Sequence, residues 1–223
     1  MRISNKLNFY FRLNCGYSVG MGHFSRALRL IQIFGAKKST LVLDSKIHQL
    51  KKYRELKKLF LYDDKKKYFS ETFDAELFIE IIKNKKNSIV IVDDYRLSQK
   101  WEKLVSNYCL KIICIDDFID RKHFSDYYIN TKPDLYNIDI QQKKKLIKNN
   151  KKNCKLLLGP DYHLVNQSIK KINRKEKKIS ITFYNGSSGN LAIYKKIIKK
   201  LLSFKKKKIK INLIDGVFSK STL

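Results

Sequence analysis

The chain has 223 residues, 43% of them apolar, and its 49 Lys and Arg against 20 Asp and Glu give a formal net charge of +29. This length supports one sizeable core and part of a second. No apolar run reaches the roughly 20 residues of a membrane span or resembles a signal peptide. The composition therefore predicts a soluble α/β protein of the cytoplasm, without stable membrane insertion.

The lysine surplus raises the question of nucleic-acid binding. Its runs are scattered at 65–67, 143–145 and 205–208. Base reading relies mostly on Arg, Asn and Gln, and no zinc-finger, helix-turn-helix or RNP-like motif accompanies the runs. We therefore expect solvated lysines and no specific nucleic-acid partner. A lysine-driven RNA or DNA binder with steep salt dependence is the alternative. In either case the charge would steer anionic ligands toward the protein.

The four cysteines are Cys15, Cys109, Cys114 and Cys154, and none has CxxC spacing. Three of them lie in or beside apolar, strand-like runs. The pattern predicts reduced, packed thiols rather than a zinc site, and we expect neither a metal nor a cofactor.

The first βα unit contains a glycine-rich turn. Residues 7–13 form an apolar run typical of a strand, and residues 27–34 have the spacing of a helix packed on a sheet. Gly16, Gly20 and Gly22 between them allow positive φ and close approach to a ligand. The free N–H groups at the start of the helix suit a phosphate.

His23 lies in the first turn of that helix, and Arg26 follows one turn later on the same face. The helix dipole disfavours the cationic form of a histidine at this end, which leaves a neutral imidazole available as a general base. The pair predicts a place where a phosphorylated substrate meets a base. The alternative without a function is that the glycines form a tight turn and that His23 is an exposed residue at the start of the helix.

Further elements continue the α/β alternation. A helix is expected within 47–56, a short strand at 59–62 and a helix around residues 73–82. Residues 132–153 are Lys- and Asn-rich and predict a surface helix or loop. Short apolar runs typical of buried parallel strands lie at 39–43, 88–92, 110–115, 127–130 and 155–158.

Polar side chains follow these strands. Asp93 and Asp94 end one of them, and we expect Asp94 to cap the helix that begins near Ser98. For Tyr95 we favour a substrate contact, because a phenol offers a stacking face for a sugar and a hydroxyl. Asn130 ends a later strand, at the sheet edge where open α/β sheets bind ligands.

These residues resemble the UDP-2,4-diacetamido-2,4,6-trideoxy-β-L-altropyranose hydrolases of pseudaminic acid synthesis and the related spore-coat polysaccharide biosynthesis proteins. The Gly-Met-Gly-His-Phe-Ser-Arg segment is similar to the Gly-x-Gly-His-x-x-Arg motif of that family. Matching segments occur in the family's order at 20–26, 92–97, 115–117, 128–130 and 158–164.

The resemblance implies a GT-B-like fold, in which a Rossmann-type N-terminal domain holds the sugar and a C-terminal domain holds the nucleotide. It also implies metal-independent hydrolysis of a UDP-sugar, with inversion at C1. His23 would activate water, Tyr95 would lie near the sugar, and Arg12 and Asn14 match the family's Arg-x-Asp. Asn14 departs from the pattern, because an amide cannot exchange a proton.

The C-terminal region reads as an incomplete second α/β domain. We expect an N-terminal catalytic domain over 1–172, a linker over 173–178 and a partial nucleotide-binding βαβ unit over 179–223. Gly186 and Ser187 match the family's Gly-Gly-Thr/Ser-Asp turn, whereas Asn185 and Ser188 do not. About 45 residues are few for an independent domain, so the second domain is either truncated, completed by a partner chain or packed on the first domain.

Besides the lysine-driven RNA or DNA binder, three functions remain open at this point. The first is hydrolysis of a nucleotide-sugar by His23. The second is glycosyl transfer by a GT-B enzyme, which uses a similar Gly-x-Gly-His turn. The third is a non-catalytic remnant that binds a sugar nucleotide or a partner protein, which the departures at Asn14, Asn185 and Ser188 favour.

Overall fold

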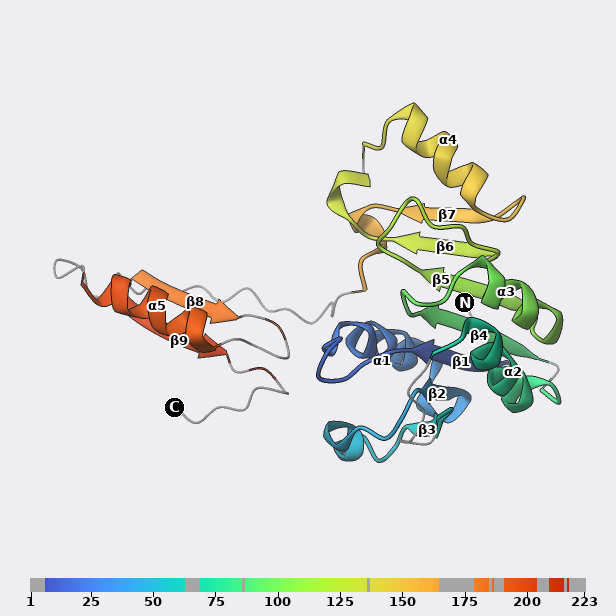
Figure 1. The fold of residues 1–223 in the computed structure, drawn as a ribbon, viewed down its shortest axis with the longest axis horizontal. Coiled ribbons are helices and arrows are strands. Elements are labelled where there is room, and N and C mark those ends of the chain that lie inside the picture. Colours follow the sequence, from blue (N-terminus) through green and yellow to red (C-terminus); the bar gives the residue numbers. More distant parts are fainter. Residues whose placement is uncertain are drawn as a thin grey trace. The chain divides into compact units, whose positions relative to one another are not determined.

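A computed structural model describes residues 7–62, 69–85, 87–135, 137–164, 179–184, 186, 191–203, 209–214 and 216. The chain divides into two compact units. Unit 1 comprises residues 1–14 and 23–165, and unit 2 comprises residues 15–22 and 166–223 (Figure 1). The expected domain boundary at 172 and linker at 173–178 lie outside the described residues.

Unit 1 is built on a parallel sheet of seven strands in the order β3-β2-β1-β4-β5-β6-β7 (Figure 1). In this doubly wound order, successive strands are added on one side of β1 up to β3 and on its other side from β4 onward. The order confirms a Rossmann-like α/β architecture. The strands are β1 (Asn8–Leu13), β2 (Ser39–Leu43), β3 (Lys57–Phe60), β4 (Ser88–Asp93), β5 (Lys111–Ile115), β6 (Tyr127–Asn130) and β7 (Lys155–Leu158).

Helices connect these strands. The predicted helix within 47–56 is wrong: a 3₁₀ helix, His48–Lys52, takes its place, and β3 begins two residues before the expected strand. The segment buries only one of its residues, Leu50, so no apolar stripe supports further helical turns. The α-helices are α1 (Gly22–Phe34), α2 (Glu71–Ile82), α3 (Gln99–Val105) and α4 (Ile140–Asn149), and the other 3₁₀ helices are Ala36–Lys38, Ser106–Tyr108, Pro133–Leu135 and Pro160–Tyr162.

Side chains alternate between the two faces of the sheet along β1, as the strand period of two requires. Phe9 stacks on Phe34 of α1, with ring centroids 4.1 Å apart. Tyr10 instead joins the buried cluster formed with α2 and α3. Odd-numbered residues of β1 therefore face α1, and even-numbered residues face α2 and α3.

The second face carries the larger apolar cluster. Phe78 of α2 and Trp101 of α3 are fully buried there, with ring centroids 5.0 Å apart. Val90 and Val92 of β4 lie in the same cluster. Burial of such side chains stabilises by about 1.5–3 kcal/mol each, so this face fixes α2 and α3 against β4.

Unit 2 contains a second βαβ segment at the expected place. It consists of β8 (Ile179–Tyr184), α5 (Leu191–Leu202) and β9 (Ile209–Ile214), and the two strands pair in parallel. Residues 15–22 form the glycine-rich turn, where Gly16 and Gly20 exchange backbone hydrogen bonds of 3.1 and 2.7 Å. Gly20 has φ 84°, a conformation that favours glycine.

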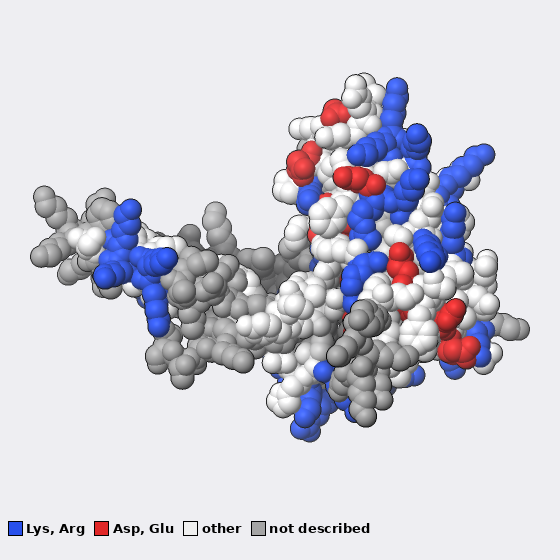
Figure 2. Space-filling view, in the orientation of Figure 1, with Lys and Arg blue, Asp and Glu red and all other residues white. Residues whose placement is uncertain are grey.

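Charged side chains are distributed over the surface of unit 1. Figure 2 shows Lys and Arg in several separate groups, one of them over α4, whose sequence includes three consecutive lysines. Among the described helices, none combines the length and apolarity needed to cross a bilayer.

Candidate functional site

His23 is the second residue of α1, and its imidazole is buried rather than exposed. Its Nδ1 lies 2.6 Å from Oδ1 of Asp93, the last residue of β4. The exposed fractions are 6% for His23 and 2% for Asp93. Because α1 follows β1, the two residues meet where the strand order reverses, at the position where open α/β sheets bind ligands.

This contact defines the tautomer of His23. Nδ1 also lies 3.0 Å from Nη2 of Arg26, which only donates, but the Asp93 carboxylate is nearer and only accepts, so we assign the proton to Nδ1 and the lone pair to Nε2. Within the described ranges, Nε2 has no hydrogen-bond partner. The ring of Tyr95 lies edge-on to the imidazole, with centroids 4.7 Å apart. The histidine is therefore held in one orientation with a basic nitrogen available.

Arg26 holds Asp93 in place. Its Nε and Nη2 donate to the two carboxylate oxygens over 2.8 and 2.7 Å, and Nη1 donates to Asp117 over 3.1 Å. Burial alone would lower the pKa of Arg26, but its hydrogen bond and charge interaction with Asp93 outweigh burial and raise it. These donors are engaged within the protein, and the substrate contact expected of Arg26 stays a prediction.

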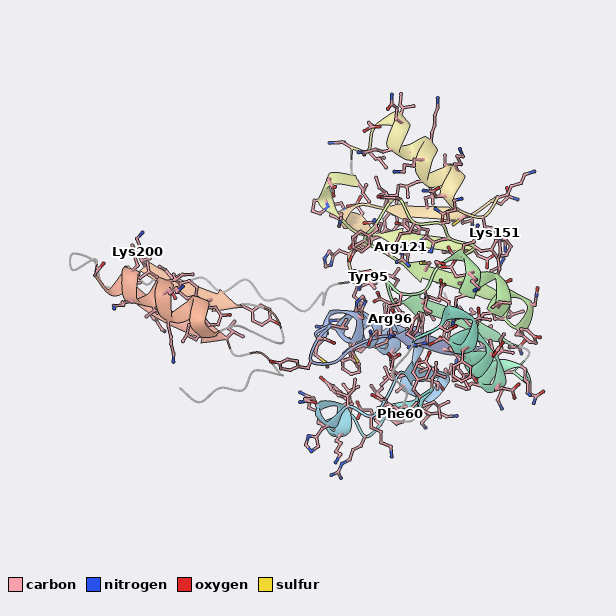
Figure 3. All side chains as sticks on the ribbon, viewed as in Figure 1. Phe60, Tyr95, Arg96, Arg121, Lys151 and Lys200 are labelled. Carbon is pink, nitrogen blue, oxygen red and sulfur yellow. The ribbon has the colours of Figure 1, made fainter. Side chains whose placement is uncertain are left out.

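Tyr95 and Asp117 complete this group, which we call the His23 cluster: His23, Arg26, Asp93, Tyr95 and Asp117. The Tyr95 hydroxyl donates to Asp117. Burial and this bond raise the pKa of Tyr95 to about 12, against the lowering effect of Arg26. Burial would raise the pKa of Asp117, but Tyr95 and Arg26 outweigh it and lower the pKa. Figure 3 labels Tyr95.

Arg12 lies on the opposite face of the sheet and has no exposed surface. Its Nε and Nη2 donate to Asp74 over 3.0 and 2.5 Å, and Nη2 also donates to Asp44 over 2.6 Å. Asp74 accepts further bonds from Tyr62 and Trp101, both 2.7 Å long. Arg12 thus ties β1 to α2, and the substrate contact expected of it stays a prediction.

The expected cap of α3 is also corrected. The N-cap is Ser98, whose Oγ accepts from the backbone N–H of Lys100. Asp94 instead accepts from the side chain of Arg96, which also binds Asp44. Because Asp94 forms a strong ion pair with Arg96, its carboxylate does not accept a hydrogen bond from the first backbone N–H groups of α3.

The remaining predicted residues are placed separately. Asn130 is fully buried, donates to Tyr128 and accepts from the backbone of Lys132. Asn14 is partly exposed after β1, and Gly22 has open space where a Cβ would lie. Gly20 lies in the turn described above and Gly186 has φ 67°, whereas Ser187 lies outside the described residues. None of these joins the His23 cluster among the described contacts.

Asp93 and Asp117 are the site residues that the sequence motif did not identify as partners of His23. Asp93 ends β4 and Asp117 is the second residue after β5, so paired acids at successive strand ends were the available indication. Their partners lie 70 and 91 residues earlier in the chain. Only the pairing of β1, β4 and β5 brings them together.

A scan of the chain against protein-family models finds no match, and a search of curated proteins finds none similar to it. The geometry of the cluster therefore carries the functional argument.

Proposed function

We propose that the chain is a nucleotide-sugar hydrolase that releases UDP from a UDP-diacetamido-trideoxy sugar, with His23 as the general base for water. The observation that carries this proposal is the His23–Asp93 pair, 2.6 Å long, at the strand-order reversal between β1 and β4. The motif resemblance supplies the substrate class, pseudaminic acid synthesis as the biological setting, and the GT-B-like arrangement.

In the proposed reaction, Nε2 of His23 takes a proton from a water molecule while the water oxygen attacks C1 of the sugar. The bond from C1 to the diphosphate oxygen breaks, UDP leaves, and C1 is inverted. Asp93 stabilises the imidazolium that forms, because its carboxylate accepts from Nδ1. A positioned base of this kind contributes about 10²–10⁴-fold to the rate.

The other members of the cluster position these groups. Arg26 binds both oxygens of Asp93 and so fixes the carboxylate that orients His23. Tyr95 confines the imidazole from its edge. The free N–H groups of α1 suit the diphosphate. The resemblance assigns the nucleotide to the region over 179–223 and matches Gly186 and Ser187 to the family's glycine-rich turn.

The test is to incubate the purified chain with the UDP-diacetamido sugar and follow UDP release, with the anomer of the free sugar identified by NMR. His23→Ala and Asp93→Asn should each lower release by about 10²–10⁴-fold. The matched control is His48→Ala, because His48 is an exposed histidine outside the cluster. Equal release by the His23→Ala variant would remove His23 from the mechanism.

Two further outcomes would replace hydrolysis with another function. Faster sugar loss on addition of an acceptor glycan, with a glycosylated product, would identify a GT-B glycosyltransferase. Binding of the UDP-sugar without release of UDP would identify a non-catalytic binding protein.

A further inference from the structure

We propose that Glu102, Cys114 and His123 of unit 1 form a zinc-binding site. Their candidate ligand atoms lie within 4.8 Å of one another. The residues come from α3, from β5 and from the segment between β5 and β6, and their exposed fractions are 0%, 3% and 1%. The site shares no residue with the His23 cluster, so the proposal is independent of hydrolysis.

The distances fit a zinc ion after a small adjustment. Nδ1 of His123 lies 2.8 Å from Oε1 of Glu102 and 3.3 Å from Sγ of Cys114. Tetrahedral coordination with ordinary zinc bond lengths separates N from O by about 3.4 Å and N from S by about 3.6 Å. The side chains therefore need to move apart by roughly 0.3–0.6 Å.

A second observation concerns the other ring nitrogen of His123. Nε2 lies 3.1 Å from Oδ2 of Asp116, and the same oxygen accepts from Arg121 over 2.5 Å. Zinc-binding histidines usually donate their second N–H to a carboxylate, which fixes the tautomer and orients the ring. Asp116 supplies that acceptor, so the lone pair of the neutral ring is at Nδ1, facing Glu102 and Cys114.

The net charge of the zinc-site residues together with their partners Asp116 and Arg121 is the same with and without the ion. Without metal, an imidazolium at His123 and the Arg121 guanidinium balance the carboxylates of Glu102 and Asp116. Both ring nitrogens of His123 then face carboxylates, Nδ1 at 2.8 Å from Glu102 and Nε2 at 3.1 Å from Asp116. Zn²⁺ displaces one proton from His123 and one from Cys114, which becomes a thiolate. The exchange leaves no buried charge uncompensated.

Three protein ligands leave one coordination position for water. The site would connect α3 to β5 and to the segment before β6, and would stabilise unit 1 wherever zinc binds the folded form alone. Because the ligands are buried, zinc would enter during folding rather than by exchange with the folded protein.

The experiment starts from the full chain, unfolded in denaturant and refolded either in EDTA or with equimolar Zn²⁺ or Co²⁺. Metal that stays bound after gel filtration is measured by elemental analysis. We expect one equivalent of zinc per chain, and for cobalt the near-ultraviolet charge-transfer band of a thiolate ligand. Protein expressed in zinc-supplemented medium provides a second sample that does not depend on refolding.

The variants separate metal binding from folding. Cys114→Ser should abolish the cobalt–thiolate band, and Asp116→Asn, which keeps all three ligands, should weaken zinc binding by about 10–100-fold. Cys109→Ser is the control, because Cys109 is a partly buried free thiol that lies outside the site. Absence of bound metal in both wild-type samples, or an unchanged cobalt band in Cys114→Ser, would overturn the proposal.

Discussion

Two histidines of unit 1 lie beside carboxylates, and their surroundings differ in one respect. His23 has a carboxylate at Nδ1 alone, whereas His123 has one at each ring nitrogen. Both rings are almost fully buried, so exposure does not distinguish them. The number of ring nitrogens that lie beside a carboxylate does: His23 has one, which leaves Nε2 for a ligand, whereas without metal both nitrogens of His123 contact carboxylates of the protein.

The largest effect expected from this difference is on stability. In EDTA, His123→Ala should lower the free energy of unfolding by about 3–5 kcal/mol, because it leaves Glu102 and Asp116 buried with one cation fewer. His23→Ala should cost only about 1–3 kcal/mol, since Arg26 still neutralises Asp93. Urea unfolding of both variants measures the two losses. Equal losses would mean that the histidines have the same structural role.

A smaller effect is expected at the edge of the His23 cluster. Tyr95→Phe removes the hydroxyl that binds Asp117 but keeps the ring against His23. One lost hydrogen bond of about 0.5–1.5 kcal/mol corresponds to a decrease in UDP release of roughly 2–12-fold. Steady-state kinetics at saturating UDP-sugar measures it. A loss as large as that of Asp93→Asn would make the phenol a catalytic group.

The smallest expected effect is on the stability of the fold at acidic pH. Burial would raise the pKa of Asp44, but Arg96 and Arg12 lower it below the unfolded value. The group therefore stabilises the fold fully above about pH 5, and this contribution is lost as the pH falls through the lowered pKa. In Asp44→Asn, the loss of stability between about pH 5 and pH 3 should be smaller than in wild type, by up to about 1 kcal/mol. Unfolding curves at both pH values test this, and a steeper acid loss in the variant would contradict it.

Much of the fold could be predicted because buried parallel strands are short apolar runs. The expected ranges 39–43, 127–130 and 155–158 coincide with β2, β6 and β7. The helix expected within 47–56 was wrong: only His48–Lys52 is helical, as a 3₁₀ helix that buries Leu50 alone. Periodicity reports local preference, and tertiary packing decides whether a helix continues.

Only the part of the site that lies within one helix could be predicted from the sequence. His23 and Arg26 lie one turn apart, so their proximity follows from helical geometry. Asp93 and Asp74 could not be assigned to their partners, because the first depends on strand order and the second lies 62 residues beyond Arg12. Cys114 gave no indication of a metal site, since its proposed co-ligands match no spacing motif.

The adjacent acids Asp93 and Asp94 serve opposite faces of the sheet, one beside His23 and the other beside Arg96. What separates them is the pairing of Leu13 with Asp93 between β1 and β4. Deleting one residue from β4 would place Asp94 opposite Leu13 and turn Asp93 to the other face without altering any charge. The alignment of two neighbouring strands thus determines which of two chemically identical side chains meets the imidazole.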